Sequence, residues 1–174
     1  MDFIGFPKIT RFYEQDVVIT EKIDGTNGVI HITPEGEMLA GSRTRWITTE
    51  NDNYGFARWV EENKNELMKL GEGTHYGEWW GQGIQRKYNM TKKVFSLFNV
   101  NRWSEAEKRP DCCDVVPVLY SGPITPQLID DFSTLKPLAL SQAALNYGIE
   151  FDRPEGYMFW FSKALQYYKV PLQK

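Results

Sequence analysis

The sequence contains few of the residues that cross-link small proteins or bind soft metals. It has two cysteines and two histidines among 174 residues. Cys112 and Cys113 are adjacent, so they cannot form an ordinary structural disulfide, and they lack the CxxC spacing of a metal knuckle. With His31 and His75 as the two histidines, a zinc site is not expected. This cysteine usage favours a reducing, cytoplasmic compartment.

Long apolar runs and an excess of positive charge are also missing. No apolar run approaches 18 residues, so no membrane span is expected, and the N-terminus lacks the pattern of a signal peptide. The net charge is -3, from 20 basic and 23 acidic residues. This balance excludes a uniformly basic nucleic-acid-binding coat, but it leaves room for a local basic groove.

The residues that are present predict one globular domain over residues 1–174. Hydrophobic residues make up 41% and aromatic residues 14% of the chain, which excludes intrinsic disorder. Strands are expected at 17–23, 28–33, 38–42, 75–80, 94–100, 115–120, 157–161 and 167–170. The first three read as a β-meander. Strands joined by turns rather than by regular crossovers favour an α+β fold with mainly antiparallel sheets and flanking helices.

Three helices are expected between these strands. Apolar residues at helical spacing predict a helix between Asn53 and Gly71, with Asn53 as its N-cap and Gly71 as its stop. A short helix begins at Thr125-Pro126, with the threonine as cap and the proline at the first helical position. Another follows Ser141.

The first chemical candidate is Glu21-Lys22-Ile23-Asp24-Gly25-Thr26-Asn27. Lys22 stands at the end of an apolar strand and directly before a glycine turn, so it is expected at a sheet rim with room for a ligand. A lysine attacks as the neutral amine, which a desolvated, cation-lined pocket favours. A surface lysine before a β-turn is an equal alternative for this segment alone.

Five further segments hold candidate residues. Arg43 and Arg45 beside Trp46 can hold phosphates, and Glu78 between glycines and indoles suits a ribose hydroxyl. The others are Phe95 and Phe98 in 94–100, Glu155 before a buried strand, and Lys169 within a strand of aromatics and valine. Each segment alone also fits ordinary core or surface.

The order of these segments is more specific than any one of them. Lys-x-Asp-Gly, Ser-Arg, Gly-Glu, Phe-x-x-Phe, Glu-Gly and a strand lysine follow one another, a set that resembles the nucleotidyltransferase motifs of covalent ligases and capping enzymes. Glu21–Asn27, Ser42–Trp46 and Gly77-Glu78-Trp79-Trp80-Gly81 are similar to the ATP-dependent RNA ligase family. The resemblance spans about residues 6–172 and implies an ATP-grasp-like adenylation domain.

The resemblance assigns a role to each matching position. Lys22 matches the lysine that attacks the α-phosphate of ATP to form lysyl-AMP. Glu21 matches the residue whose backbone faces adenine, and Glu78 matches the ribose-binding glutamate. The remaining matches are Arg43 on ribose and substrate phosphate, Phe98 stacked on adenine with Phe95 as the fallback, Glu155 for metal and catalysis, and Lys169 on the α-phosphate.

The chain departs from the family pattern in three places. Asn99 stands where many ligases have aspartate, and Lys169 is followed by Val170-Pro171 instead of a second lysine two positions on. Lys163 is a candidate for the missing charge. Five residues follow Lys169, so no OB domain or other C-terminal domain is expected, and the chain would be a bare catalytic core.

The implied function is ATP-dependent ligation of polynucleotides, RNA rather than DNA, with Mg2+ as the hard cation for phosphate and carboxylate oxygens. Its substrates are 5′-phosphate and 3′-hydroxyl ends, and RNA repair is the implied process. A DNA-preferring ligase and a non-catalytic nucleotide- or nucleic-acid-binding module remain alternatives. The pairs Lys8/Arg11, Arg86/Lys87 and Lys92/Lys93 form either a rim for RNA phosphates or ordinary surface.

Overall fold

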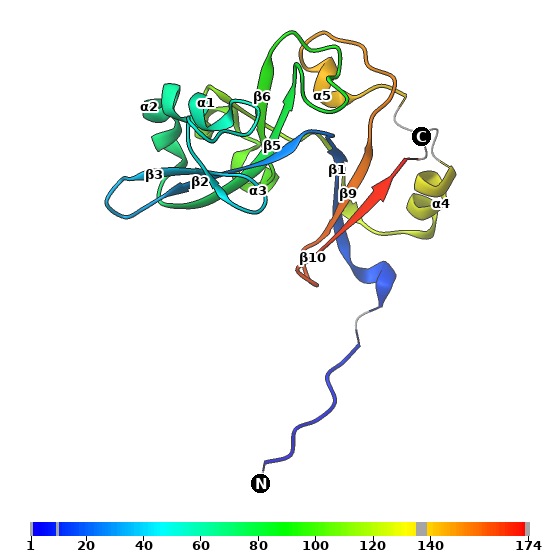
Figure 1. Ribbon diagram of the computed structural model, residues 1–174. Coiled ribbons are helices and arrows are strands. Elements are labelled where there is room, and N and C mark those ends of the chain that lie inside the picture. Colours follow the sequence, from blue (N-terminus) through cyan, green and yellow to red (C-terminus); the bar gives the residue numbers. More distant parts are fainter. Residues whose placement is uncertain (1, 10, 135–138, 173–174) are drawn as a thin grey trace.

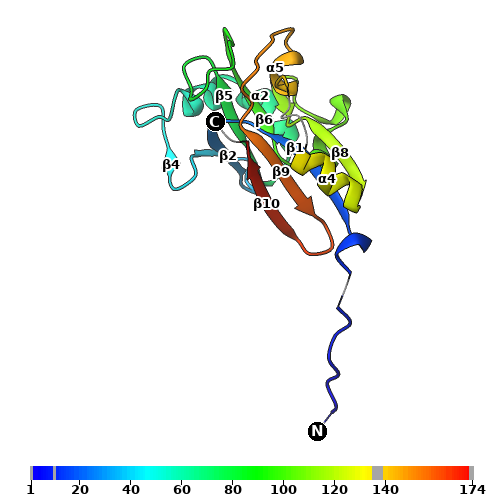
Figure 2. The same cartoon turned by 90° about the vertical axis from the view of Figure 1, so that its right-hand side faces the viewer.

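The computed structural model describes residues 2–9, 11–134 and 139–172. In this part of the chain the strands form two sheets (Figure 1). The smaller sheet has the order β10-β9-β1-β8, with β1 (Asp16–Lys22), β8 (Val118–Pro123), β9 (Gly156–Phe161) and β10 (Gln166–Pro171). All its neighbouring strands are antiparallel. Figure 2 shows β10, β9 and β1 side by side.

The larger sheet has six strands in the order β4-β3-β2-β5-β6-β7 within the described residues. Its strands are β2 (Thr26–Ile32), β3 (Met38–Gly41), β4 (Trp46–Ile47), β5 (Gly73–Gly81), β6 (Lys93–Leu97) and β7 (Cys113–Val115). Every pair is antiparallel except β6 with β7, which is parallel. The predicted α+β class with mainly antiparallel sheets is confirmed.

The expected β-meander is wrong in its first strand. β1 pairs with β8 and β9 in the smaller sheet, whereas β2 pairs with β3 and β5 in the larger one. The chain changes sheets at the turn 23–25. The strand expected at 115–120 is likewise two strands, β7 and β8, in different sheets, because Pro117 between them lacks the N–H that a continuous strand needs. The strand expected at 94–100 ends at Leu97.

The expected helix between Asn53 and Gly71 is divided into α1 (Phe56–Glu62), α2 (Lys64–Leu67) and the 3-10 turn η2 (Met68–Leu70). Asn53 is not the cap, because its side-chain amide donates to the Thr26 hydroxyl. The Asp52 carboxylate instead accepts from the N–H groups of Ala57 and Arg58, the second and third residues of α1. Gly71 ends η2 with φ +78°, as predicted.

The two predicted short helices are present. They are α4 (Pro126–Thr134), whose first turn donates to the Thr125 hydroxyl, and α5 (Gln142–Leu145), capped by Ser141. The remaining helical segments are η1 (Phe12–Glu14), α3 (Val100–Trp103) and η3 (Ala106–Lys108).

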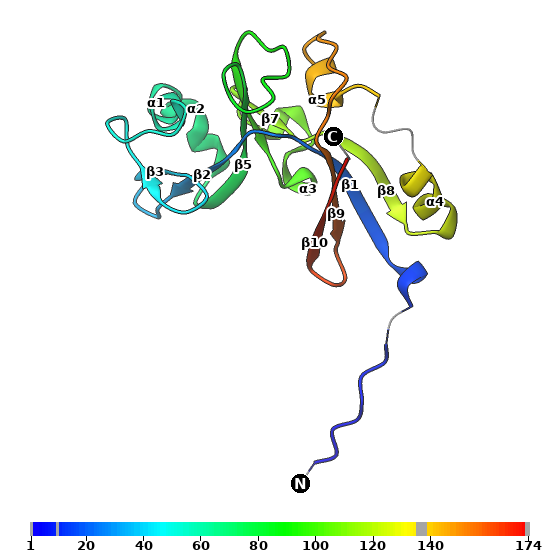
Figure 3. The same ribbon diagram turned by 45° about the vertical axis from the view of Figure 1, so that its right-hand side comes forward.

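Each sheet packs its apolar face against helices (Figure 3). The largest buried cluster lies between the six-stranded sheet and α1, α2 and η2, and includes Phe56, Trp79 and Phe95. A second cluster joins Val17 and Ile19 of β1 to strand β9 and α4. A third cluster, at one end of β5 and β6, includes Trp80, Tyr88 and alanines of α5. Among the described residues, no helix has both the length and the apolarity needed to cross a membrane.

Candidate active site

Lys22 and Glu155 lie together where β1 ends. Alternation along β1 buries Val17 and Ile19 on one face and leaves Lys22 on the other. β1 pairs with β9 so that Lys22 is opposite Gly156, which brings the preceding residue, Glu155, beside it. The Lys22 Nζ atom is 2.5 Å from Glu155 Oε1, and the two side chains are 23% and 20% exposed. The family resemblance predicted both residues in one site, and the structure brings them into contact.

The second oxygen of Glu155 has no protein partner. Glu155 Oε2 is buried and accepts no hydrogen bond from any described residue. A buried carboxylate oxygen without a partner is costly, so this atom suits a ligand proton or a hard cation. No group of three His, Cys, Asp or Glu side chains placed to hold a metal ion occurs in the described ranges. Glu155 therefore fits a cation only if a ligand such as a phosphate supplies further oxygens.

The turn after Lys22 is fixed by contacts to two other segments, β5 and the loop that contains Tyr88. The Asp24 N–H donates to the Tyr88 hydroxyl at 2.7 Å, and the Gly25 N–H donates to Glu78 Oε1 at 3.0 Å. Gly25 is required by space as well: a Cβ there would lie 2.4 Å from the Trp79 carbonyl oxygen and 2.7 Å from the Trp80 Cβ atom. The Asp-Gly step thus lets β1 pass tightly over β5.

Arg86 links this turn to the segment that holds Glu155. Its Nε atom donates to Asp24 Oδ2 at 2.9 Å, and its Nη1 atom donates to the carbonyls of Arg153 and Pro154 at 2.8 and 3.3 Å. One planar guanidinium therefore joins the residues just after Lys22 to those just before Glu155. Since the side chain is 24% exposed and its donors face these partners, Arg86 is a bridge within the site rather than part of a rim open to RNA.

Glu78 lies beside this turn on β5. Its carboxylate accepts from the Gly25 N–H and, at 3.3 Å, from the Asn27 side-chain amide. Burial raises the pKa of Glu78 from its ordinary 4.5 to about 7, against the lowering effects of the Gly25 hydrogen bond and the Lys22 charge. The charges of Glu155 and Asp24 raise this pKa further. Lys22, Glu78 and Glu155 therefore form one electrostatically coupled group.

Glu78 stands at the boundary between a closed and an open part of one sheet face. Trp80, two residues further along β5, is fully buried beneath Tyr88 and α5, whereas Tyr76, two residues back, is 57% exposed. Because alternate residues of a strand share a face, Trp80, Glu78 and Tyr76 all point to the same side. The coupled group lies at the inner end of an open surface.

The Glu21 side chain does not reach this surface. It is 1% exposed on the opposite face of β1, where it accepts from the Ser141 hydroxyl at 2.6 Å and the Ala143 N–H at 2.9 Å. Burial raises the pKa of its carboxyl group, and these hydrogen bonds lower it. Its carboxylate thus anchors α5, and its backbone N–H donates to the Pro117 carbonyl. A helix after Ser141 was predicted from the sequence, but the connection of Ser141 to Glu21 was not.

Phe98 and Phe95 occupy opposite environments. Phe95 is fully buried, with its ring 5.0 Å from that of Phe56. Phe98 follows β6, is 36% exposed, and donates its N–H to the Tyr76 carbonyl. Of the two candidates for stacking on adenine, Phe98 alone has an accessible ring.

Lys169 and Arg43 are not in contact with the coupled group. Lys169 is exposed on β10, opposite Met158 of β9, which is itself opposite Thr20. It therefore shares a face with Lys22 but lies two strands across and about 7 Å along the sheet. Arg43 is exposed in the bend between β3 and β4.

Four members of this arrangement were not predicted from the sequence. Asp24 and Asn27 were inside the quoted first segment but had no role beyond a turn, and Arg86 was offered as a surface cation. Tyr88 was not singled out. Only the Lys-x-Asp-Gly pattern pointed to Asp24, since hydrogen bonds across 51 to 68 positions leave no local signal.

The chain is thus an α+β protein whose two mainly antiparallel sheets are joined by the segment that follows a strand-end lysine, and this lysine is paired with a carboxylate. A family model described as RNA ligase matches residues 15–160, and the chain belongs to this family. No curated protein sequence matches the chain.

Solved structures support the same fold. A mutant RNA ligase of Naegleria gruberi with ATP and Mn superposes with a TM-score of 0.68 at 17% identity, covering 92% of this chain and 50% of that one. Another mutant of that ligase, with AMP and Mn, gives a TM-score of 0.67 at 17% identity, covering 91% and 50%. The structure of the ligase with PPi gives 0.67 at 18%, with the same coverage. The chain thus spans about half the length of these ligases, and at this identity the likeness shows the fold alone.

Proposed function

We propose that this chain is an ATP-dependent RNA ligase that forms lysyl-AMP on Lys22. The observation that supports this most directly is the contact of Lys22 with Glu155 beside the partly buried Glu78, at the inner end of an open sheet face. A protein that only binds nucleotides or nucleic acid would not need a lysine nucleophile at the end of this strand. Family membership and the ATP and AMP in the Naegleria structures favour the same reaction.

The reaction has three steps. The neutral Lys22 amine attacks the α-phosphorus of ATP, forming a P–N bond while pyrophosphate leaves with the electrons of the broken P–O bond. The 5′-phosphate of an RNA end then displaces the lysine and takes the AMP. A 3′-hydroxyl finally attacks that 5′-phosphate, and AMP leaves as the strand is sealed in RNA repair. Each step depends on alignment and charge stabilisation more than on a strong base.

The proposed roles are those that the family resemblance implies, and positions in the fold support some of them. Glu155 lies in the ion pair with Lys22, so this carboxylate is the nearest group to receive a proton when Lys22 attacks. Glu78 accepts from a ribose hydroxyl, Phe98 stacks on adenine, and the backbone of Glu21 faces its edge. Arg43 and Lys169 neutralise phosphate charge from opposite sides of the site.

A divalent cation fits the Glu155 side of the site. The buried, unpartnered Oε2 atom of Glu155 is a hard oxygen ligand, and phosphate oxygens of ATP would complete the coordination. When bound, Mg2+ or Mn2+ would neutralise charge that develops on the phosphates. In this proposal the chain forms one adenylation domain, and its two free cysteines fit a reducing, cytoplasmic setting.

Incubation with ATP and Mg2+ or Mn2+, followed by intact mass measurement, tests the proposal. The expected result is a gain of one AMP that pyrophosphate removes, and sealing of 5′-phosphate RNA ends in a gel assay. ATP binding without an adduct under both metals would instead indicate the non-catalytic nucleotide-binding alternative. A parallel panel of DNA ends tests the preference for RNA.

A further inference from the structure

A row of side chains crosses the open face of the six-stranded sheet. Strand pairing sets Trp46 opposite Gly41, Gly41 opposite Val29, and Val29 opposite Tyr76. Phe98 continues the row beside Tyr76, since its N–H donates to the Tyr76 carbonyl and Leu97 is paired with Gly77. Directly opposed residues in antiparallel strands point to the same face. We call these five residues the aromatic row.

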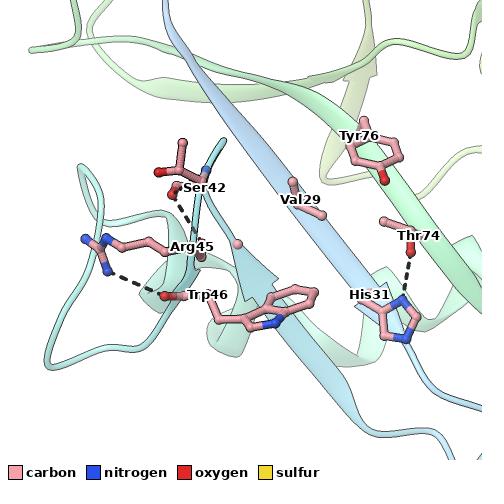
Figure 4. Close-up of a pocket in the computed structure, with 9 residues that line it drawn as sticks. Val29, His31, Ser42, Arg45, Trp46, Thr74 and Tyr76 are labelled. Carbon is pink, nitrogen blue, oxygen red and sulfur yellow. Dashed lines mark hydrogen bonds between the residues drawn. The ribbon is translucent and has the colours of Figure 1, made fainter.

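The end of the row at Trp46 lines a pocket of about 460 Å³ (Figure 4). Val29 and Gly41 form its floor, and the Trp46 and Tyr76 rings stand at its two sides. A Cβ atom at Gly41 would lie 3.2 Å from the Trp46 ring, so the glycine gives this indole room to lie close to the sheet. His31 and Thr74, which are paired two residues further along the same face, also line the pocket, and His31 Nδ1 is 2.8 Å from the Thr74 hydroxyl.

The Trp46 and Tyr76 side chains of the pocket are both exposed. Trp46 and Tyr76 are each 57% accessible, and Trp46 is the one tryptophan among the exposed large hydrophobic residues described. Rings left open on a sheet face lose the stabilisation of burial, and they are typical of surfaces on which nucleobases stack. Val29 and Gly41 between them leave a flat, apolar floor, which matches the face of a base.

The bend between β3 and β4 adds positive charge at the rim of this pocket. Ser42 and Arg45 close the bend through their backbones, and Arg45 donates to the carbonyls of Trp46 and Asn51. Figure 4 shows the Arg45 guanidinium turned away from the sheet face. Arg45 therefore stiffens the bend, and Arg43, which follows the pocket residue Ser42 in the chain, is exposed and available for a phosphate.

The pocket continues directly from the proposed adenylation site. Tyr76 is two residues from Glu78 on the same face of β5, about 7 Å away along the strand. We propose that Trp46 and Tyr76 form a stacking subsite for a nucleobase of single-stranded RNA next to the end that is joined. This inference rests on the proposed function, because it takes the neighbouring site as the place where RNA ends react.

Binding of a 5′-phosphorylated single-stranded RNA oligonucleotide tests the subsite. The variants are Trp46→Ala, Trp46→Phe, which keeps a stacking ring, and Tyr13→Ala as the control. Tyr13 is 52% exposed in η1, outside the aromatic row. Fluorescence anisotropy of labelled RNA gives the affinity, and intact mass gives lysyl-AMP formation in the same preparations.

The expected result is a loss of RNA affinity of about five- to hundredfold in Trp46→Ala, in line with the loss of one stacked base. Trp46→Phe is expected to retain most of the affinity, and Tyr13→Ala all of it. Lysyl-AMP formation should be unchanged in all three variants. An oligonucleotide with abasic residues near its end should bind the wild type and Trp46→Ala equally.

Three outcomes overturn the subsite. The first is that Trp46→Ala does not weaken RNA binding, either because its affinity equals that of the wild type or because the wild type itself binds no RNA. The second is a raised ATP requirement for lysyl-AMP in Trp46→Ala at unchanged RNA affinity, which assigns the pocket to ATP. The third is concentration-dependent dimerisation in sedimentation that Trp46→Ala abolishes, which assigns it to a second copy of the chain.

The same measurements separate failure of the subsite from failure of the proposed function. If the wild type forms no lysyl-AMP, but Trp46→Ala binds RNA more weakly than the wild type, the stacking subsite is supported and the ligase proposal fails. If lysyl-AMP forms and the variants bind RNA equally, the ligase proposal stands and the subsite fails.

Discussion

The two ends of one face of β5 differ in how deeply their side chains are buried and in how they are hydrogen-bonded. At the closed end, Trp80 is fully buried, and its indole N–H donates to the Ser96 hydroxyl at 2.8 Å. Tyr88 and Arg86 hold the Lys22 turn there through hydrogen bonds to Asp24. At the open end, Tyr76 has an exposed ring.

This difference separates the two tasks proposed for the face. Alignment of a nucleophile is lost by displacements of about 1 Å, so the groups around Lys22 benefit from rigid contacts. Stacking on RNA of varied sequence needs only accessible rings and positive charge, and an open surface can supply both. Changes at the closed end should therefore act on lysyl-AMP formation, and changes at the open end on nucleic-acid affinity.

Lys22→Arg should have the largest effect at the closed end. Arginine keeps the charge opposite Glu155 but remains protonated and is a poor nucleophile, so no AMP adduct should form. Intact mass after incubation with ATP and a divalent cation measures this, with Lys64→Arg on the exposed part of α2 as the control. Sealing of RNA supplied with a 5′-adenylyl group should persist. An adduct formed at the wild-type rate would falsify the role of Lys22.

Arg86→Ala should slow lysyl-AMP formation by about 10- to 100-fold, because the bridge between Asp24 and the carbonyls before Glu155 is lost. Arg86→Lys can keep the ion pair with Asp24 but not all the hydrogen bonds that the guanidinium makes, so an intermediate rate of lysyl-AMP formation is expected. Single-turnover rates at saturating ATP measure the effect. Arg58→Ala, on the exposed side of α1, is the control. A loss of RNA affinity at an unchanged adenylation rate would instead place Arg86 on the RNA-binding surface.

Glu78→Gln should weaken ATP use by about tenfold and also change how stability depends on pH. With its pKa raised from 4.5 to about 7, Glu78 keeps its proton in the folded state at pH values where the unfolded chain releases it. Stability therefore falls as pH rises from 4.5 to 7, by about 3 kcal/mol at most, and this contribution is flat outside that window.

Thermal unfolding of the wild type and Glu78→Gln at pH 5 and pH 8 checks this sign. The variant should gain stability relative to the wild type on going to pH 8. Glu72→Gln, at an exposed position before β5, should not. An identical pH dependence in all three proteins would show that the Glu78 carboxylate is not desolvated.

Phe98→Leu should have the smallest effect, a several-fold higher ATP requirement with little change in stability, because a partly exposed stacking ring is lost. Phe95→Leu should do the reverse and destabilise the fold by about 1–3 kcal/mol, since its ring fills the core beside Phe56. Denaturant unfolding and ATP titration of lysyl-AMP formation measure the pair. The same ATP requirement in both variants would remove Phe98 from the adenine site.

Most elements were predictable because their signals are local. The cap at Thr125, the stop at Gly71 and the helix after Ser141 each depend on neighbours within a few positions, and all are observed. The prediction of one continuous helix between Asn53 and Gly71 was wrong at Asn63, where a φ of -106° ends α1. Its side-chain amide bonds back to the Trp59 carbonyl. Such a competing hydrogen bond is decided by geometry rather than by apolar spacing.

The sequence by itself determined the α+β class, because residue types at short spacings record strand periodicity and turn chemistry. The family and the candidates Lys22, Glu78 and Glu155 followed from the resemblance of its ordered motifs to those of RNA ligases. Only the tertiary structure decided that β1 leaves the meander and that Glu21 anchors α5. It also revealed that Arg86 bridges the site and that Trp46 and Tyr76 share one row. The physical reason is the same in each case. Strand pairing and long-range hydrogen bonds join residues that are tens of positions apart, and no local pattern encodes which partner each will meet.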